Sequence, residues 1–381
     1  MIEFFTPVNI HSEDIQHNHN LYEYIDIHRE HHIPDWEESE ILIFDISPLE
    51  NEHIPKENNT ISKIRKSFYQ LFPGKWNLKI ADLGTLVLES DTQKNLKLIQ
   101  EIISHFLLHG KHLIILGKDH ALTYSIAKGI SKSEKIVNCS IVDSKIDLKP
   151  EGEKNTEKIL NTNFISNMLW DEEILLNNLH LIGCQAYYQP PAYLDFLRKM
   201  YIDCFSLGEI KGNINAIEPE LRTSHFLSLD ISSLEYAFMP LQAQPVPNGL
   251  NGVEACRLSR LSGLGTENKV LGIFGFIPEN FTHGEGENLL SQIIWYYLEG
   301  KNESFLLKSL ENKEEMITFH VPNNLINLKF FKQPESELWW VEINDLQIED
   351  KIFPCSYADY KQAVSNKISE RIKKIIEKNK A

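Results

Sequence analysis

The chain has 381 residues, 42% of them hydrophobic and 10% aromatic, which is enough to bury one large core or two smaller ones. Its formal net charge of −16 argues against nucleic acid as a partner, because phosphate binding requires a basic surface. The acidic balance is typical of a soluble cytoplasmic protein. Residues 1–5 show no basic segment leading into a long apolar run, so we expect no signal peptide, and no apolar stretch is long enough to cross a bilayer.

Five cysteines occur singly, without the CxxC spacing that structural zinc sites use. Their number is odd and their neighbours are mostly apolar, so we expect reduced and buried thiols. They are Cys139, Cys184, Cys204, Cys256 and Cys355.

Residues 1–40 are polar and rich in histidine, and we expect them to form an irregular surface arm. Short apolar runs then alternate with segments of helical periodicity. The runs are apolar almost throughout, as strands are when a parallel sheet buries both of their faces. The predicted strands are 41–46, 78–83, 112–116, 138–143, 179–184, 200–205, 225–230 and 270–275. The clearest predicted helices are 58–72, 91–109, 120–131, 190–199, 251–264 and 286–300.

This alternation predicts an α/β fold, a three-layer and doubly wound, mostly parallel sheet of eight strands. We place the core at residues 41–300 and a small C-terminal extension at 301–381, with two strands at 316–321 and 337–343. The extension ends in a basic amphipathic helix at 361–381. Such a helix could bind an acidic partner, but we favour docking on the chain's own acidic body.

Chemically useful side chains follow three of the predicted strands. Asp143 and Asp230 each end a strand, and His120 follows a third strand where a helix begins. Ligands of open α/β sheets bind at the carboxyl ends of strands, so we expect these groups on one rim, with Asp147 turning back toward them. A single Asp of this kind is more often a helix N-cap. Together, three carboxylates and one imidazole suit Mn²⁺ or a similar divalent cation.

The segments around these residues resemble the metal-binding signature of the ureohydrolase family, which includes arginase, agmatinase and formimidoylglutamase. The family's Gly-Gly-Asp/Asn-His, Asp-Ala-His-x-Asp and Ser-x-Asp-x-Asp-x-x-Asp-Pro motifs are similar, in order, to 117–120 (GKDH), 143–147 (DSKID) and 228–235 (SLDISSLE). Two more family motifs are similar to 81–84 (ADLG) and 247–255 (PNGLNGVEA), and the resemblance spans residues 40–300.

The family binds two metal ions that share two bridging aspartates. The resemblance implies that the protein ligands of one ion are present, with Asp143 and Asp230 as the catalytic carboxylates. The implied ligands are His120, Asp143, Asp147 and Asp230.

Three positions depart from the family pattern. The residues that would serve only the second ion are Lys145 and Ser232 in this chain, and Gly275 stands where the family often has a glutamate that holds an amidine or guanidine substrate. We therefore expect one Mn²⁺ ion or none. We also expect the Lys145 ammonium to reach toward Asp143 and Asp230 and to replace the charge of the second ion.

The segment after Asp147 begins Asp-Leu-Lys-Pro and looks most like the formimidoylglutamase branch. In active relatives this loop reads the amino-acid end of the substrate, so the resemblance implies substrate-loop candidates. These are Lys149, Asn161 and Asn163. The lysines at 149, 154 and 158 could contact a dicarboxylate, but solvated loop lysines are the favoured interpretation.

We interpret the sequence as a ureohydrolase-fold protein, closest to formimidoylglutamases, with a reduced site that lacks efficient guanidine or amidine hydrolysis. Its expected ligand is a small amidine or an amino acid. One alternative is a single-metal hydrolase that acts on an amidine C–N bond. Another is a non-catalytic subunit that pairs with an active paralogue, and a homo-oligomer also stays open.

Overall fold

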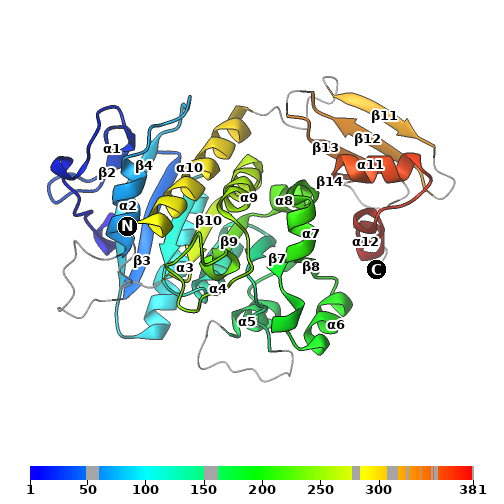
Figure 1. Cartoon of the computed structure of the whole chain (residues 1–381), viewed down its shortest axis with the longest axis horizontal. Helices are drawn as coiled ribbons and strands as arrows, with labels where there is room; N and C mark the ends of the chain where they lie inside the picture. The colour runs from blue at the N-terminus through cyan, green and yellow to red at the C-terminus, as the bar shows by residue number, and fades with distance from the viewer. Residues whose placement is uncertain are drawn as a thin grey trace.

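The computed structural model describes residues 1–48, 60–149, 162–276, 284–306, 316–322, 326–334, 336–344, 346 and 351–379. Within these ranges no helix combines the length and the apolar character needed to span a membrane. A ten-stranded sheet forms the centre of the molecule, and a separate four-stranded sheet lies at one end, next to the C-terminus (Figure 1).

All eight strands that the apolar runs predict are present, and they run parallel to one another. In space they follow the order β4-β3-β5-β10-β9-β6-β7-β8. The strands are β3 (Ile41–Pro48), β4 (Ile80–Leu88), β5 (His112–Gly117), β6 (Val137–Val142), β7 (Leu176–Cys184), β8 (Asp203–Ser206), β9 (Phe226–Asp230) and β10 (Val270–Phe274).

The first 40 residues do more than form the expected surface arm. Their short strands β1 (Phe5–Thr6) and β2 (Asp26–Ile27) both pair with β4. Leu21, at the start of α1 (Leu21–Tyr24), is fully buried in the core. A two-residue strand has no periodicity to detect, which is why the sequence pattern did not predict this part of the sheet.

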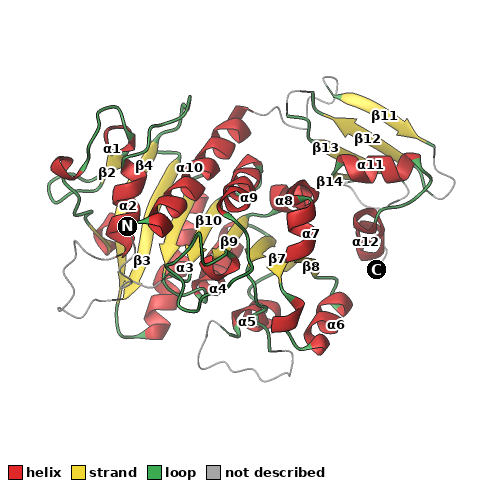
Figure 2. Ribbon diagram, viewed as in Figure 1, coloured by secondary structure: helices red, strands yellow, loops and turns green. Residues whose placement is uncertain are grey.

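Helices flank the large sheet (Figure 2), and alternate residues along each strand point to opposite faces. In β5, Ile114 and Leu116 join one core cluster, whereas Leu113 and Ile115 join the other. The first face is covered by α2 (Thr60–Tyr69), α7 (Leu207–Gly212), α8 (Glu218–Thr223), α9 (Gly252–Leu264) and α10 (Glu285–Leu306). The second face is covered by α3 (Thr92–Leu108), α4 (Leu122–Ser133), α5 (Phe164–Trp170) and α6 (Pro191–Lys199). The predicted three-layer α/β fold is thus confirmed.

The C-terminal extension contains an antiparallel sheet and two helices. Both predicted strands are present, as β11 (Ile317–Val321) and β13 (Trp339–Ile343). Two further strands, β12 (Leu328–Lys332) and β14 (Ile352–Cys355), complete the order β11-β12-β13-β14. In place of one long helix the tail forms α11 (Tyr357–Val364) and α12 (Glu370–Lys378).

The basic helix α12 docks on the acidic core of its own chain, as the sequence favoured. The Arg371 guanidinium binds the Glu220 carboxylate of α8, with Nε 2.7 Å from Oε1, and it also contacts Asp359. Lys374 pairs with Asp203 of β8. The ion pairs to Glu220 and Asp203 attach α12 to the core, whereas the buried Ile372 packs in the small hydrophobic cluster of the extension itself.

Candidate metal centre

Four neighbouring strands of the large sheet, β5, β10, β9 and β6, end at one edge. The register pairs Phe274 with Gly117 on one side and with Asp230 on the other. Val142, the last residue of β6, pairs with Leu229 of β9. Residues just beyond these strands therefore lie at one level, although they come from distant parts of the sequence.

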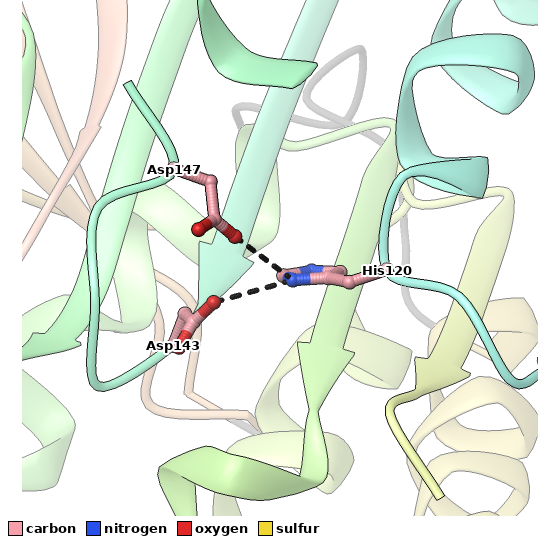
Figure 3. A group of neighbouring side chains, drawn as sticks. All are labelled: His120, Asp143 and Asp147. Atoms are coloured by element: carbon pink, nitrogen blue, oxygen red, sulfur yellow. Dashed lines mark ion pairs between the residues drawn. The ribbon is translucent and has the colours of Figure 1, made fainter. Parts of the chain in front are cut away.

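This edge brings the predicted ligands together around one imidazole nitrogen (Figure 3). The Nδ1 atom of His120 lies 3.2 Å from Oδ2 of Asp143, 3.7 Å from Oδ2 of Asp147 and 3.3 Å from Oδ2 of Asp230. In His120, Asp143 and Asp147, one ligand atom from each lies within 4.8 Å of the others. Asp230 approaches the same nitrogen from β9.

The donor set fits a divalent cation. Two donors that bind one ion at about 2.1 Å, with 90–120° between the bonds, lie about 3.0–3.6 Å apart. The distances from Nδ1 to the three carboxylates fall close to that range. Nδ1 is also buried and makes no hydrogen bond of acceptable geometry. Imidazole nitrogen with carboxylate oxygens is a set that manganese and similar ions accept.

The other side of the His120 ring is held by the core. Nε2 lies 3.0 Å from the Ser228 hydroxyl, which lies 2.6 Å from the Thr123 hydroxyl. Phe164 and Phe274 pack against the ring with centroid distances of 4.7 and 5.8 Å. A hydrogen bond from Nε2–H to the serine keeps Nδ1 available as the ligand atom, as partners of metal-binding histidines usually do.

The buried charges shift the pKa values of the centre. Burial alone would lower the pKa of His120, but its close contacts with the Asp143 and Asp147 carboxylates and the charge of Asp230 raise it to about 10. Burial raises the pKa of Asp147 to about 7, against the close contact with His120. Burial also raises the pKa of Asp230, and the charge of Asp143 adds to this effect. The imidazole therefore holds a proton here, which a metal ion would have to displace.

The second oxygen of two of the carboxylates accepts hydrogen bonds from nearby residues of the chain. Asp143 Oδ1 accepts the backbone N–H of Lys145 at 3.0 Å and the Ser232 hydroxyl at 3.3 Å. Asp230 Oδ1 accepts the backbone N–H of Ser232 at 2.7 Å. In both aspartates the other oxygen, Oδ2, is the one that lies beside His120 Nδ1.

The expectation for the Lys145 side chain is wrong. Its ammonium does not reach the carboxylates: Nζ lies 3.4 Å from Oε1 of Gln244 and 5.7 Å from the centre of the Tyr188 ring. The residue is exposed, so the ammonium keeps its hydration, whereas placing it among buried carboxylates would cost desolvation.

Gly275 lies directly against the centre. Its backbone has a φ of +91°, and a Cβ atom added there would meet Oδ1 of Asp230 at 2.7 Å and Oδ2 at 2.9 Å. A glutamate at this position would therefore displace a predicted ligand unless the backbone changed. The sequence pattern identified the position but not this contact.

The candidates from the substrate loop are only partly described. Lys149 is exposed, and its backbone N–H donates to the Ser166 hydroxyl at 2.6 Å. Asn163 is buried, and its carbonyl oxygens accept from the Asn167 amide. Asn161 and the lysines at 154 and 158 lie outside the described residues. Lys149 and Asn163, the two described residues, therefore both contact side chains of α5.

Ser228 and Thr123 have roles that the sequence analysis missed. Ser228 belongs to a recognised motif, so its position was known, but nothing in the pattern showed that its hydroxyl faces Nε2 of His120. Thr123 lies on α4, three residues after His120, and no motif in the sequence marked it as part of the site.

The comparisons agree with this fold. A model of the arginase family matches residues 55–273, more than half of the chain. Formimidoylglutamase from Bacillus subtilis is 17% identical, with a TM-score of 0.63 over 78% of this chain and 95% of that chain. A Trypanosoma cruzi formiminoglutamase with Mn²⁺ is also 17% identical, with a TM-score of 0.62 over 74% and 98% of the two chains.

The agmatine ureohydrolase of Thermoplasma volcanium is 19% identical, with a TM-score of 0.55 over 77% of this chain and 97% of that chain. No curated protein matches the sequence. At these identities the solved structures establish the fold, and the match of the family model establishes the relationship. The chain belongs to the arginase family.

Proposed function

We propose that this chain is a formimidoylglutamase-like member of the arginase family that binds one divalent cation and lacks efficient hydrolysis of guanidines and amidines. One observation carries the proposal. The four predicted ligands meet at Nδ1 of His120, whereas the two positions that would serve a second ion carry the Ser232 hydroxyl and the exposed Lys145, whose ammonium lies 3.4 Å from Gln244.

The residues that would hold the ion are His120, Asp143, Asp147 and Asp230. A bound Mn²⁺ would lower the pKa of its water and supply a hydroxide near neutral pH. Ser228 fixes the His120 ring, and the backbone amides of Lys145 and Ser232 fix the two carboxylates. The T. cruzi formiminoglutamase with Mn²⁺ supports manganese as the ion to test first.

A second ion would require further side-chain ligands beside Asp143 and Asp230. The side chains that face that region are a serine hydroxyl and an exposed lysine whose ammonium lies on Gln244. A protonated lysine cannot ligate a metal, and a neutral hydroxyl is a weaker ligand for a hard cation than a carboxylate. The proposed centre therefore lacks the pair of ions that jointly activates water in the family pattern.

Elemental analysis of the purified protein tests this proposal directly. We expect at most one Mn²⁺ per chain after loading and dialysis, and two in the variant Lys145→His/Ser232→Asp. The variant Lys373→Met, on the exposed side of α12, controls for changes in nonspecific binding. Two tightly bound ions in the unaltered protein would refute the mononuclear centre.

Activity is tested separately, by release of urea, ammonia or formamide from arginine, agmatine, guanidinobutyrate and formimidoylglutamate with added Mn²⁺. We expect no turnover comparable to that of an active family member. Rapid turnover of any of these substrates would favour the single-metal hydrolase instead. Pairing with an active paralogue and a cytoplasmic location stay predictions, and copurification of a partner would support the first.

A further inference from the structure

A cavity lies between the C-terminal helix α12 and the edge of the large sheet. Its volume is about 120 Å³, and residues of β7, β8, α8, β14 and α12 line it. The cavity depends on the C-terminal extension, because residues of α12 and β14 form part of its wall. Half of its lining residues lie outside the segment that the arginase family model matches.

His180 lines this cavity with an unpaired ring nitrogen. The side chain is buried in the middle of β7, and its Nδ1 lies 2.8 Å from Oδ2 of Asp203. A carboxylate only accepts hydrogen bonds, so Nδ1 carries a proton and Nε2 is the nitrogen left for a further partner, as an acceptor when the ring carries no second proton. Nε2 is buried and has no hydrogen-bond partner among the described residues. Buried polar atoms without a partner are rare and call for an explanation.

The cations of α12 differ in how they are paired. Arg371 is bound by two carboxylates and Lys374 by Asp203. Lys378 contacts only amide oxygens, the backbone carbonyl of Asn177 and Oδ1 of Asn178, the latter at 2.7 Å. In the part of the chain that the structure describes, no carboxylate lies within ion-pair distance of Lys378. The residue as a whole is exposed, but partial burial and the neighbouring Lys374 lower the pKa of this ammonium, and an anion beside it would offset the repulsion from Lys374.

Apolar side chains supply much of the remaining wall: Pro219 of α8, Phe353 and Pro354 of β14, and Ile375 of α12. Thr223 and Glu220 also line it, and the Glu220 carboxylate is already paired with Arg371. Such a lining favours an organic ligand over a bare inorganic anion, because a hydrated phosphate or sulfate gains nothing from apolar contact.

We propose that this cavity binds a small organic carboxylate that also carries a hydroxyl group. The carboxylate pairs with the Lys378 ammonium, the hydroxyl donates a hydrogen bond to Nε2 of His180, and the apolar body packs against Phe353 and Ile375. The site is independent of the metal centre and needs no metal ion.

Calorimetric titration of the full-length protein with 3- and 4-hydroxybenzoate tests the proposal. We expect saturable binding of at least one of them, weakened tenfold or more by Lys378→Met and by His180→Asn. The asparagine amide keeps a donor for Asp203 near the position of Nδ1 and lacks Nε2. Lys373→Met is the matched control, because Lys373 is exposed on the same helix and pairs only with Glu370.

The probes separate the two contacts. Benzoate lacks the hydroxyl and 4-hydroxybenzyl alcohol lacks the carboxylate, so both should bind at least tenfold more weakly than the better hydroxybenzoate. Three results would overturn the proposal: no saturable binding of either hydroxybenzoate, tighter binding of inorganic phosphate, or equal affinity in wild type and Lys378→Met. If His180→Asn does not fold, the comparison with benzoate and the Lys378 variant still decides.

Discussion

Replacing Gly275 by alanine is expected to weaken Mn²⁺ binding by displacing Asp230. The backbone at Gly275 has a φ of +91°, which costs a residue with a Cβ about 1–2 kcal/mol. The added Cβ would lie 2.7 Å from Oδ1 of Asp230, and ordinary contact requires the carboxylate to move by at least about 0.5 Å. That movement breaks either the 2.7 Å bond from the Ser232 N–H or the approach of Oδ2 to His120. Losing this carboxylate should raise the Kd for Mn²⁺ at least about tenfold, or about 1.4 kcal/mol.

Isothermal titration with Mn²⁺ and thermal unfolding without metal measure the two effects separately. The matched control is Gly110→Ala, since Gly110 also has a positive φ, +72°, but an added Cβ there meets no atom within 4 Å. Both variants should be destabilised by about 1–2 kcal/mol without metal through backbone strain alone. Only Gly275→Ala should lose affinity for Mn²⁺. Unchanged affinity in Gly275→Ala, or an equal loss in Gly110→Ala, would refute the steric argument.

Three further predictions follow from buried contacts elsewhere in the chain. Ser228→Ala removes the acceptor for Nε2 of His120 and should weaken Mn²⁺ binding about 10- to 100-fold by calorimetry, whereas Ser262→Ala, a buried serine of α9, should not. Burial lowers the pKa of Lys301 to about 7. The Lys301 amine therefore binds its proton more tightly in the unfolded chain than in the folded one. As a result, the free energy of unfolding should rise between about pH 7 and 10, by at most about 5 kcal/mol. In Lys301→Met this rise should be absent when denaturant titrations are repeated at different pH values. Arg371→Met leaves two buried carboxylates without their cation and should cost about 3–5 kcal/mol, seen as faster hydrogen exchange over α12.

The sheet was predictable because strands buried on both faces are apolar throughout. All eight of its parallel strands coincide with apolar runs in the sequence. The six clearest predicted helices coincide with segments of helical periodicity. The missed elements have weak signals. α7 and α8 have six residues each, β1 and β2 have two, and β14 contains Pro354, which cannot donate to the ladder and is typical of edge strands.

The convergence of His120 with the three aspartates was predictable because the carboxyl ends of parallel strands meet at one edge. The strand order itself was not, since β10 inserts between β5 and β9 although it is the last strand of the sheet in sequence. Side-chain direction was also beyond the pattern. The backbone N–H of Lys145 points at Asp143, while its ammonium lies on Gln244. Residue spacing alone does not show whether the ammonium turns toward the carboxylates or away from them.

The three altered positions act as one unit. Gly275 leaves room for the Asp230 carboxylate, the Ser232 side chain places a hydroxyl on Asp143, and the Lys145 ammonium lies on Gln244, so neither side chain supplies a ligand for a second ion. Lys145→His alone would add an imidazole but leave the Ser232 hydroxyl on Asp143, and Ser232→Asp alone would add a carboxylate without a nitrogen ligand. Each single variant should therefore bind no more than one Mn²⁺ by elemental analysis, and only the double variant two. A second ion in either single variant would show that these residues do not jointly exclude it.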